Sequence, residues 1–142
     1  MHAATRRARL KLRMHAVAPP FPWAEGVDYS QAVVAGPLVF VAGQGPFEED
    51  GRIVATDFAE QLRRTYRNLE RVLAEADASL GDVAQMTVYL VEESHYAIFK
   101  TVRREFFEAP FPASTVVRAG LLFEGMLVEI DAIAVRGGRF AL

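Results

Sequence analysis

The 142-residue chain contains no cysteine, only three histidines and no apolar run near the roughly 20 residues that a membrane-spanning helix needs. Without cysteine there are no disulfides, no thiolate metal sites and no cysteine nucleophile. His2, His15 and His95 lack metal-ligand spacing, so we expect no metal site, and they are too scattered for a hydrolase triad. We also expect no membrane partner, and we interpret the protein as cytoplasmic.

Acidic residues are missing from the first 24 positions, whereas five of the sixteen basic residues lie between Arg6 and Arg13. The remaining chain carries eleven basic and eighteen acidic residues, a net charge of −7. Because the body is acidic and lacks a basic, aromatic-lined groove, we expect no nucleic-acid partner. We interpret residues 1–13 as a basic, disordered arm. Translation from Met14, or an arm that contacts nucleic acid or anionic lipid, is the alternative.

The rest of the chain has the composition of an ordinary globular domain, with 51% hydrophobic and 24% charged residues. Its length suits a single domain, which we expect to span residues 14–142. β-branched and alternating runs separated by turn residues predict five strands. These strands span residues 30–35, 38–42, 83–91, 113–119 and 126–136. Gly36-Pro37 separates the first two strands, and Asp50-Gly51 predicts a further turn.

Two helices are predicted between these strands. Asp57 and Glu60 have capping-box spacing, and apolar residues recur every three or four positions, which indicates a helix over residues 57–76. Ser94 is expected to cap a second helix that Pro110 ends. This order predicts an α+β fold, a mixed sheet with both helices on one face. Since no further helix can cover the other face, we expect an oligomer that packs sheets together.

Two local sequences bear on chemistry. The segment "GQGPFE", residues 43–48, begins like a dinucleotide-binding fingerprint but lacks its third glycine, so it predicts a tight turn instead. In "MLVEIDAIAV", alternation places Glu129 and Asp131 on one face among apolar neighbours. Either this part of the face meets solvent or a cation of a partner, or a carboxyl lies in a partly dry cleft. In the second case desolvation raises its pKa and fits it for proton transfer near neutrality.

Four quoted segments together resemble the Rid/YjgF superfamily of reactive-intermediate deaminases. They are "DYSQAVVAGPLVFVAGQGPF", "FAEQLRRTYRNLERVLAEADASLGDVAQMTVYL", "FPAS" and "VEIDAIAV", in family order across roughly residues 27–136. The resemblance implies a chorismate-mutase-like β-α-β fold and a homotrimer with clefts between subunits. It also implies hydrolysis of 2-imino acids or their enamine tautomers to 2-keto acids and ammonia, and no cofactor.

The resemblance also assigns roles to residues. In the family an arginine directly after "FPA" grips the substrate carboxylate, and the first acid of "EI(E/D)AIA" positions or activates water. Here that acid is Glu129, the tyrosine of "YSQ" is Tyr29, and the position after "FPA" is Ser114. A serine common before "GQ" is Ala42, and an asparagine of the second helix aligns with Lys100.

Serine in place of the arginine is expected to lower activity on small 2-imino acids roughly a thousandfold, since each charge-assisted hydrogen bond contributes about 1.5–3 kcal/mol. Arg118 lies on the same strand face as Ser114 but about 13 Å further along, and Lys100 offers a point charge rather than a planar fork. The candidate catalytic residue is therefore Glu129. The candidate substrate contacts are Tyr29, Ser114, Thr115, Arg118 and Lys100.

Two functions fit these residues. One is a cofactor-independent hydrolase of a small imine, enamine or related metabolite that is a poor 2-imino-acid deaminase. The other is a trimeric protein that binds a small metabolite without turnover. A chaperone-like or ribonuclease role, both attached to the family, is a third reading that the acidic body disfavours for RNA.

Overall fold

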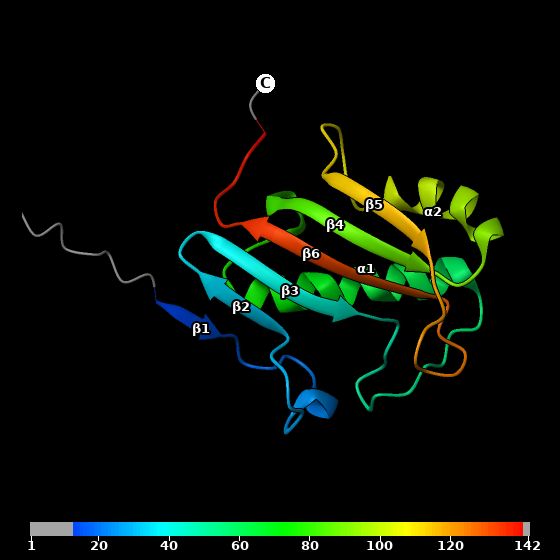
Figure 1. The fold of residues 1–142 in the computed structure, drawn as a ribbon, viewed down its shortest axis with the longest axis horizontal. Helices are drawn as coiled ribbons and strands as arrows, with labels where there is room; N and C mark the ends of the chain where they lie inside the picture. Colours follow the sequence, from blue (N-terminus) through cyan, green and yellow to red (C-terminus); the bar gives the residue numbers. More distant parts are fainter. Residues whose placement is uncertain (1–12, 141–142) are drawn as a thin grey trace, which may run out of the picture.

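A computed structural model describes residues 13–140 of the chain. They form one six-stranded sheet in the order β1-β2-β3-β6-β4-β5, with two α-helices on one face (Figure 1). The strands are β1 (Met14–Ala16), β2 (Ala32–Ala35), β3 (Leu38–Gln44), β4 (Val83–Leu90), β5 (Ala113–Arg118) and β6 (Val128–Val135). The helices are α1 (Phe58–Glu75) and α2 (Tyr96–Arg103), with short 3-10 turns η1 (Pro22–Ala24), η2 (Leu80–Asp82) and η3 (Glu93–His95).

The architecture confirms the predicted α+β fold with a mixed sheet. Strands β4 and β5 are parallel and every other neighbouring pair is antiparallel. A parallel pair needs a crossover, and α2 supplies it between β4 and β5. This crossover leaves β5 at one edge of the sheet, with only one hydrogen-bonded neighbour.

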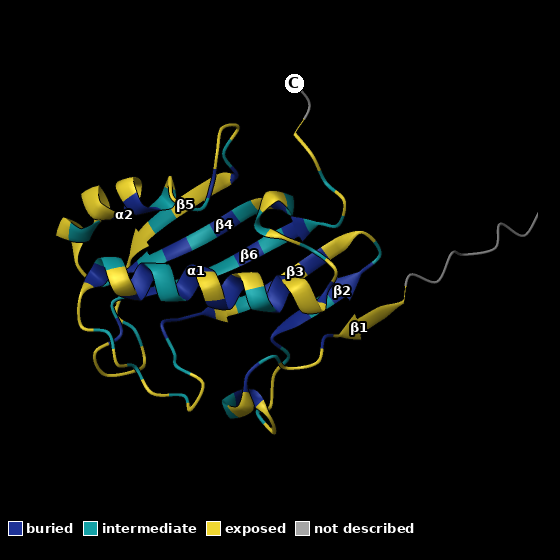
Figure 2. Cartoon of the chain, turned by 180° about the vertical axis from the view of Figure 1, so that it is seen from behind, coloured by how far each residue is buried: buried dark blue, intermediate teal, exposed yellow. Residues whose placement is uncertain are grey.

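The long helix α1 forms where capping and periodicity predict it. The Asp57 carboxylate accepts a hydrogen bond from the backbone N–H of Glu60 at 3.2 Å, which satisfies one free donor of the first turn. The reciprocal half of the capping box is replaced, because the Glu60 side chain pairs with Arg63 instead. Leu62, Leu69 and other apolar residues of α1 are buried against the sheet (Figure 2).

Three details of the predicted elements were wrong. The strand β1 was not expected, because three residues give too little periodicity to detect; Met14 of β1 pairs with Ala35 of β2. The second helix begins after η3 and ends at Arg103, well before Pro110, and Ser94 makes no capping hydrogen bond. Residues 43–44 belong to β3 rather than to a tight turn. Residues 1–12 of the predicted arm lie outside the described residues.

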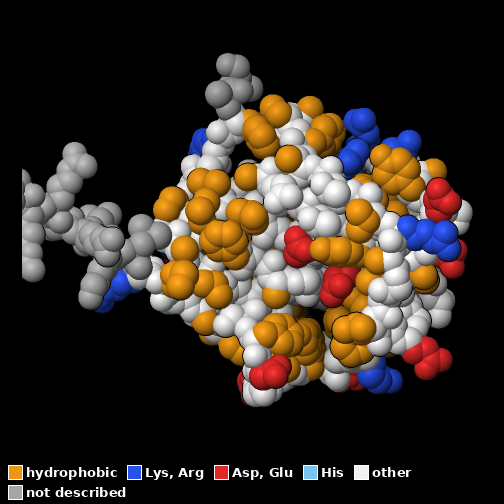
Figure 3. All heavy atoms as spheres, viewed as in Figure 1, with side chains coloured by type: hydrophobic (Ala, Val, Ile, Leu, Met, Phe, Trp, Pro, Cys, Tyr) orange, Lys and Arg blue, Asp and Glu red, His pale blue; other side chains and the backbone are white. Residues whose placement is uncertain are grey.

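The two sides of the sheet differ in cover. Val128, Ile130, Ala132 and Ala134 of β6 face the helices and are at most 2% exposed. On the opposite face Leu38 and Phe40 of β3 are exposed, and apolar side chains gather there around acidic ones (Figure 3). Within residues 13–140 this open face has no helix over it (Figure 1). Across the same span, no helix is both long and apolar enough to cross a membrane.

Candidate functional site

Two carboxyls lie side by side on the open face of the sheet. Strand alternation places Glu129 and Asp131 on that face, and both are half-buried. In the register of β6 with β4, Glu129 is opposite Tyr89. The Tyr89 hydroxyl donates a hydrogen bond to Asp131 Oδ2 at 3.0 Å. Among the described residues no ion pair involves either carboxyl. Asp131 is therefore stabilised by its hydrogen bond from the Tyr89 hydroxyl.

A β-bulge brings the backbone of β3 against the Glu129 carboxyl. The register of β3 with β6 shifts between Val41 and Gln44, so Ala42 and Gly43 form the bulge. A Cβ atom at Gly43 would stand 2.7 Å from Glu129 Oε1, so glycine is required for this approach. The strand therefore seats the carboxyl on bare backbone at the centre of the open face.

Two buried glutamines hold the bulge in place. Gln44 Nε2 donates to Gln31 Oε1 at 3.0 Å and to the carbonyl of Ala42 at 3.1 Å. The Ala42 N–H donates to the Gln31 carbonyl at 2.9 Å. Tyr29 precedes Gln31 by two residues in the same loop and is 52% exposed. The loop that carries Tyr29 is thus tied directly to the bulge beside Glu129.

The electrostatics of the open face favour a proton-transfer role. Burial raises the pKa of Glu129 above its usual value, and the negative charge of Asp131 raises it further. The hydrogen bond to Asp131 raises the pKa of Tyr89, which keeps its hydroxyl protonated. A raised pKa makes the carboxyl a stronger proton acceptor once it is ionised, which favours a role in proton transfer.

The other predicted contacts lie in a separate groove beside the edge strand β5. This groove has a volume of about 360 Å³ and runs between β5 and the η3–α2 segment. Its lining includes Leu90, Glu93, Tyr96, Ser114, Val116 and Arg118. Lys100 reaches it only through Tyr96, whose ring centroid lies 5.0 Å from Lys100 Nζ.

Within one chain Ser114 does not lie on the same side of the sheet as Glu129. Parallel pairing aligns Ser114 with Met86, a buried residue of the helix face, and Thr115 with Thr87. Because side chains alternate along a strand, Ser114 and Arg118 lie on the helix side of the sheet, while Thr115 shares the open face with Glu129. One chain therefore brings Ser114 and Arg118 together, but separates both from the carboxyl.

Sequence reasoning missed Gly43, Glu93 and Tyr96. For Gly43 a signal was present, since a glycine inside an apolar strand pattern is typical of a bulge or a close backbone approach. For Glu93 and Tyr96 no signal was available, because only the crossover through η3 and α2 brings them to β5.

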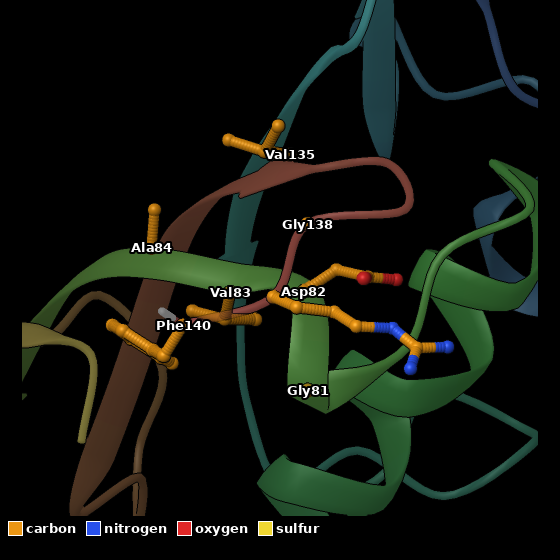
Figure 4. A pocket seen from close by; sticks show the side chains of 8 residues that line it. Gly81, Asp82, Val83, Ala84, Val135, Gly138 and Phe140 are labelled. Atoms are coloured by element: carbon orange, nitrogen blue, oxygen red, sulfur yellow. The ribbon is translucent and has the colours of Figure 1, made fainter. Parts of the chain in front are cut away.

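A further pocket of about 200 Å³ lies at the opposite end of β4 (Figure 4). Val83, Ala84, Val135 and Phe140 give it an apolar lining, and none of the predicted site residues contributes to it. Asp82 also borders it, but its carboxylate already accepts a hydrogen bond from the backbone of Ser79. Arg139 also lines this pocket, so it combines an apolar wall with one cationic side chain. Within residues 13–140 no three histidine, aspartate or glutamate residues cluster to hold a metal ion.

Comparison with known proteins gives consistent matches over this domain. The sequence profile of the family described as Endoribonuclease L-PSP matches residues 22–136. A RutC family protein of Pyrococcus abyssi is 42% identical over 107 residues, which are 75% of this chain and 84% of that protein. TdcF of Escherichia coli K12, provisionally named a reactive intermediate deaminase, is 32% identical over 76% of this chain and 86% of its own.

Solved structures agree with these sequence matches. The crystal structure of E. coli TdcF with bound serine has a TM-score of 0.76 at 32% identity, covering 86% of this chain and 98% of that one. The crystal structure of yeast Mmf1 has a TM-score of 0.80 at 28% identity, covering 87% and 98%. The Saccharomyces cerevisiae protein MMF1, named mitochondrial, is 30% identical over 119 residues, 84% of this chain and 79% of that protein.

Proposed function

This chain belongs to the Endoribonuclease L-PSP family, the Rid/YjgF superfamily, and from that premise we propose that it hydrolyses a small imine or enamine. The observation that carries the proposal is the Glu129 carboxyl, half-buried on the bare backbone of Gly43 with a raised pKa. An enamine first tautomerises to the imine. Glu129 then takes a proton from water as the water oxygen adds to the C=N carbon, and it returns that proton to the nitrogen. The remaining hydroxyl proton also moves to the nitrogen, and ammonia leaves as the carbonyl forms. No cofactor takes part.

We further propose that the working unit is a homotrimer. Leu38, Phe40 and Val117 are exposed on the open face, and large apolar side chains gathered on one surface favour contact with another protein. A neighbouring copy that covers this face also brings its β5 edge towards Glu129. The cleft is then completed by Ser114 of one subunit and Glu129 of the next. Tyr29 and Thr115 are the remaining substrate contacts, and Lys100 borders the site through Tyr96.

The substrate of this cleft is not a small 2-imino acid. Ser114 supplies a hydroxyl where the family has a guanidinium, so the carboxylate next to the reacting carbon has no bidentate partner at that position. The same hydroxyl is the observation that favours the second candidate function, a trimer that binds a small neutral metabolite without converting it.

The direct test generates 2-aminoacrylate with a dehydratase and follows its hydrolysis with and without the protein. We expect wild type to be about a thousandfold slower than arginine-bearing relatives. Ser114→Arg should recover activity, whereas Ser114→Lys, which adds charge without the planar fork, should recover less. Glu129→Gln in the Ser114→Arg background should lower turnover by about 10²–10⁴-fold.

Each outcome separates the hypotheses. Activity in Ser114→Arg that Glu129→Gln abolishes supports the hydrolase mechanism. Full activity of wild type would contradict the role assigned to position 114. An inactive Ser114→Arg that still binds serine or a keto acid would favour the binding protein. A sedimentation mass near 15.7 kDa, the monomer value, would remove the shared cleft.

We also propose a cytoplasmic location for the protein, with residues 14–142 as the working domain. The alternative is a location in an organelle, since one yeast relative is named mitochondrial. Fluorescent fusions of the full chain and of residues 14–142, compared in the same cells, test both statements. If the full chain alone enters an organelle, residues 1–13 carry an address and the cytoplasmic location is wrong.

A further inference from the structure

The groove beside β5 has different chemistry at its two ends. At one end Arg118 pairs in register with Leu90, and Glu93 follows Leu90 by three residues, so both charged side chains line the same end. Among the described residues neither takes part in an ion pair, with each other or with a third group. Both are exposed to the groove, and each is available to a charge on a ligand.

The rest of the groove is apolar until it reaches a hydroxyl. Val116 and Leu90 line its middle, and the Tyr96 ring forms one wall. Ser114 stands at the far end, four residues and about 13 Å from Arg118 along the strand. An Arg118 side chain extended towards Ser114 would cover about half of that length, which would leave about 6 Å, or about five bonds of an extended chain.

We propose that this groove binds the zwitterionic head of an elongated amino acid. Arg118 donates hydrogen bonds to the carboxylate, and Glu93 accepts hydrogen bonds from the ammonium group. The apolar chain extends along Val116 towards Ser114. The inference rests on the proposed function for the remainder of the substrate: a C=N or C=O group at the far end of the chain reaches the cleft with Glu129. The substrate class is therefore an amino acid with an imine at the end of its side chain, rather than an imine beside its carboxylate.

Paired opposite charges select for this head group. A simple carboxylate meets attraction from Arg118 but repulsion from Glu93, and a simple amine meets the reverse. Only a ligand that carries an ammonium group and a carboxylate on the same carbon can pair with both side chains at once. The distance to Ser114 selects for chain length, because each methylene buried on the apolar wall contributes about 0.8 kcal/mol, or about fourfold in affinity.

The test is calorimetric titration of the full-length protein with unreactive probes. L-Norleucine carries both charges and a linear chain, hexanoate carries only the carboxylate, and pentylamine carries only the ammonium. We expect L-norleucine to bind at least about tenfold more tightly than either single-charge probe. L-Alanine, which lacks three methylenes, should bind at least about tenfold more weakly than L-norleucine.

Substitutions then assign the contacts. Arg118→Gln and Glu93→Gln should each weaken L-norleucine at least about tenfold. The matched controls Arg67→Gln and Glu70→Gln, both on the exposed side of α1, should leave its affinity unchanged. Hexanoate should bind more tightly to Glu93→Gln than to wild type, because the repelling carboxylate is gone. Thermal unfolding of each variant checks that the fold is retained.

The results separate this inference from the proposed function. No binding of L-norleucine by wild type, or equal affinity for hexanoate, overturns the inference even if 2-aminoacrylate is hydrolysed. Binding that depends on Arg118 and Glu93, in a protein that hydrolyses no imine even as Ser114→Arg, supports the groove and overturns the hydrolase.

Discussion

The two faces of β6 place alternate residues of one strand in opposite environments. Val128, Ile130 and their helix-side neighbours are sealed under α1, whereas Glu129 and Asp131 remain half-buried on the open face. Residues on the helix side contribute to stability through burial. Residues on the open side are free to contact a ligand or a second chain. Core and candidate chemistry are therefore one residue apart in sequence but on opposite faces of the sheet.

Gln61 on the helix side and Glu129 on the open face also differ in how many hydrogen bonds they form. On the helix side Gln61 is fully buried and satisfied: Nε2 donates to the carbonyls of Ala55 and Gly125 at 2.8 Å, and Oε1 accepts from the Leu127 N–H at 2.9 Å. These bonds fix the chain where it enters β6. On the open face Glu129 forms no hydrogen bond among the described residues. The carboxylate oxygens of Glu129 can therefore accept hydrogen bonds from a substrate, a water molecule or a neighbouring subunit.

The sharpest test of this contrast uses the same substitution on both faces. Ile130→Ala removes a fully buried side chain and should lower the free energy of unfolding by about 2–5 kcal/mol. Ile133→Ala, three residues along on the open face, should cost less in the folded monomer because that side chain is only half-buried. Urea unfolding at two protein concentrations measures both.

Concentration dependence tells the two effects apart. If a second chain covers the open face, the loss in Ile133→Ala is larger at the higher protein concentration, where the assembly is populated, and shrinks towards the monomer value on dilution, while the loss in Ile130→Ala stays the same. Equal, concentration-independent losses would show that both faces are closed within one chain, and the distinction between them would be lost.

A substitution at the bulge between β3 and β6 should lower the free energy of unfolding by less than Ile130→Ala does. Gly43→Ala inserts a Cβ at 2.7 Å from Glu129 Oε1, so the carboxyl must move. Because the clashing group is the end of a side chain, the free energy of unfolding should fall by only about 1–3 kcal/mol. Imine hydrolysis should fall more, since the carboxyl leaves its position.

In the control variant Gly81→Ala the added Cβ meets only Ser79 Oγ at 3.6 Å, so neither the free energy of unfolding nor imine hydrolysis should change. Unaltered hydrolysis in Gly43→Ala would remove Glu129 from the mechanism.

The fold was largely predictable from the sequence because its signals are local. The cap at Asp57 and the apolar spacing of α1 lie within one helix, and the alternation of β6 lies within one strand. The errors fall where local signals are weak or misleading: β1 is three residues long, and α2 begins after Ser94 and ends at Arg103, well before Pro110. The order of the strands in the sheet was not predicted, because it depends on pairing between distant segments.

The candidate site was harder to predict because it depends on register. Alternation gives the face that Glu129 shares with Asp131, but not how β5 aligns with β4. Moving that register by one residue would bring Ser114 to the open face. Similarly, the bulge at Gly43 depends on pairing between β3 and β6, and the groove depends on the crossover through α2. A glycine inside a strand pattern can indicate a bulge, but a single sequence does not show which distant segment the bulge or the groove will contact.

The open face should also be visible in the pH dependence of stability. The pKa of Glu129 is raised in the folded state above its usual 4.5. Its contribution to stability is therefore complete below pH 4.5, and it is lost as the pH rises through the higher folded-state value. Wild type should lose stability relative to Glu129→Gln as the pH rises through that interval, by less than the substitutions above because the carboxyl is half exposed. Chemical unfolding from about pH 4 to pH 8 measures the difference. A difference that grows in favour of wild type would reverse the assigned shift.

The smallest effects come from removing one hydroxyl on each side of the sheet. Tyr89→Phe deletes the donor to Asp131 on the open face and should lower the free energy of unfolding by no more than about 1 kcal/mol. Tyr66 of α1 is fully buried, burial raises its pKa, and its hydroxyl has no partner among the described residues. Tyr66→Phe should therefore leave stability unchanged or raise it by about 1 kcal/mol, because a desolvated donor is removed. Urea unfolding of both variants gives the two signs. A loss in Tyr66→Phe as large as that in Tyr89→Phe would mean that the buried Tyr66 hydroxyl is hydrogen-bonded in the folded protein.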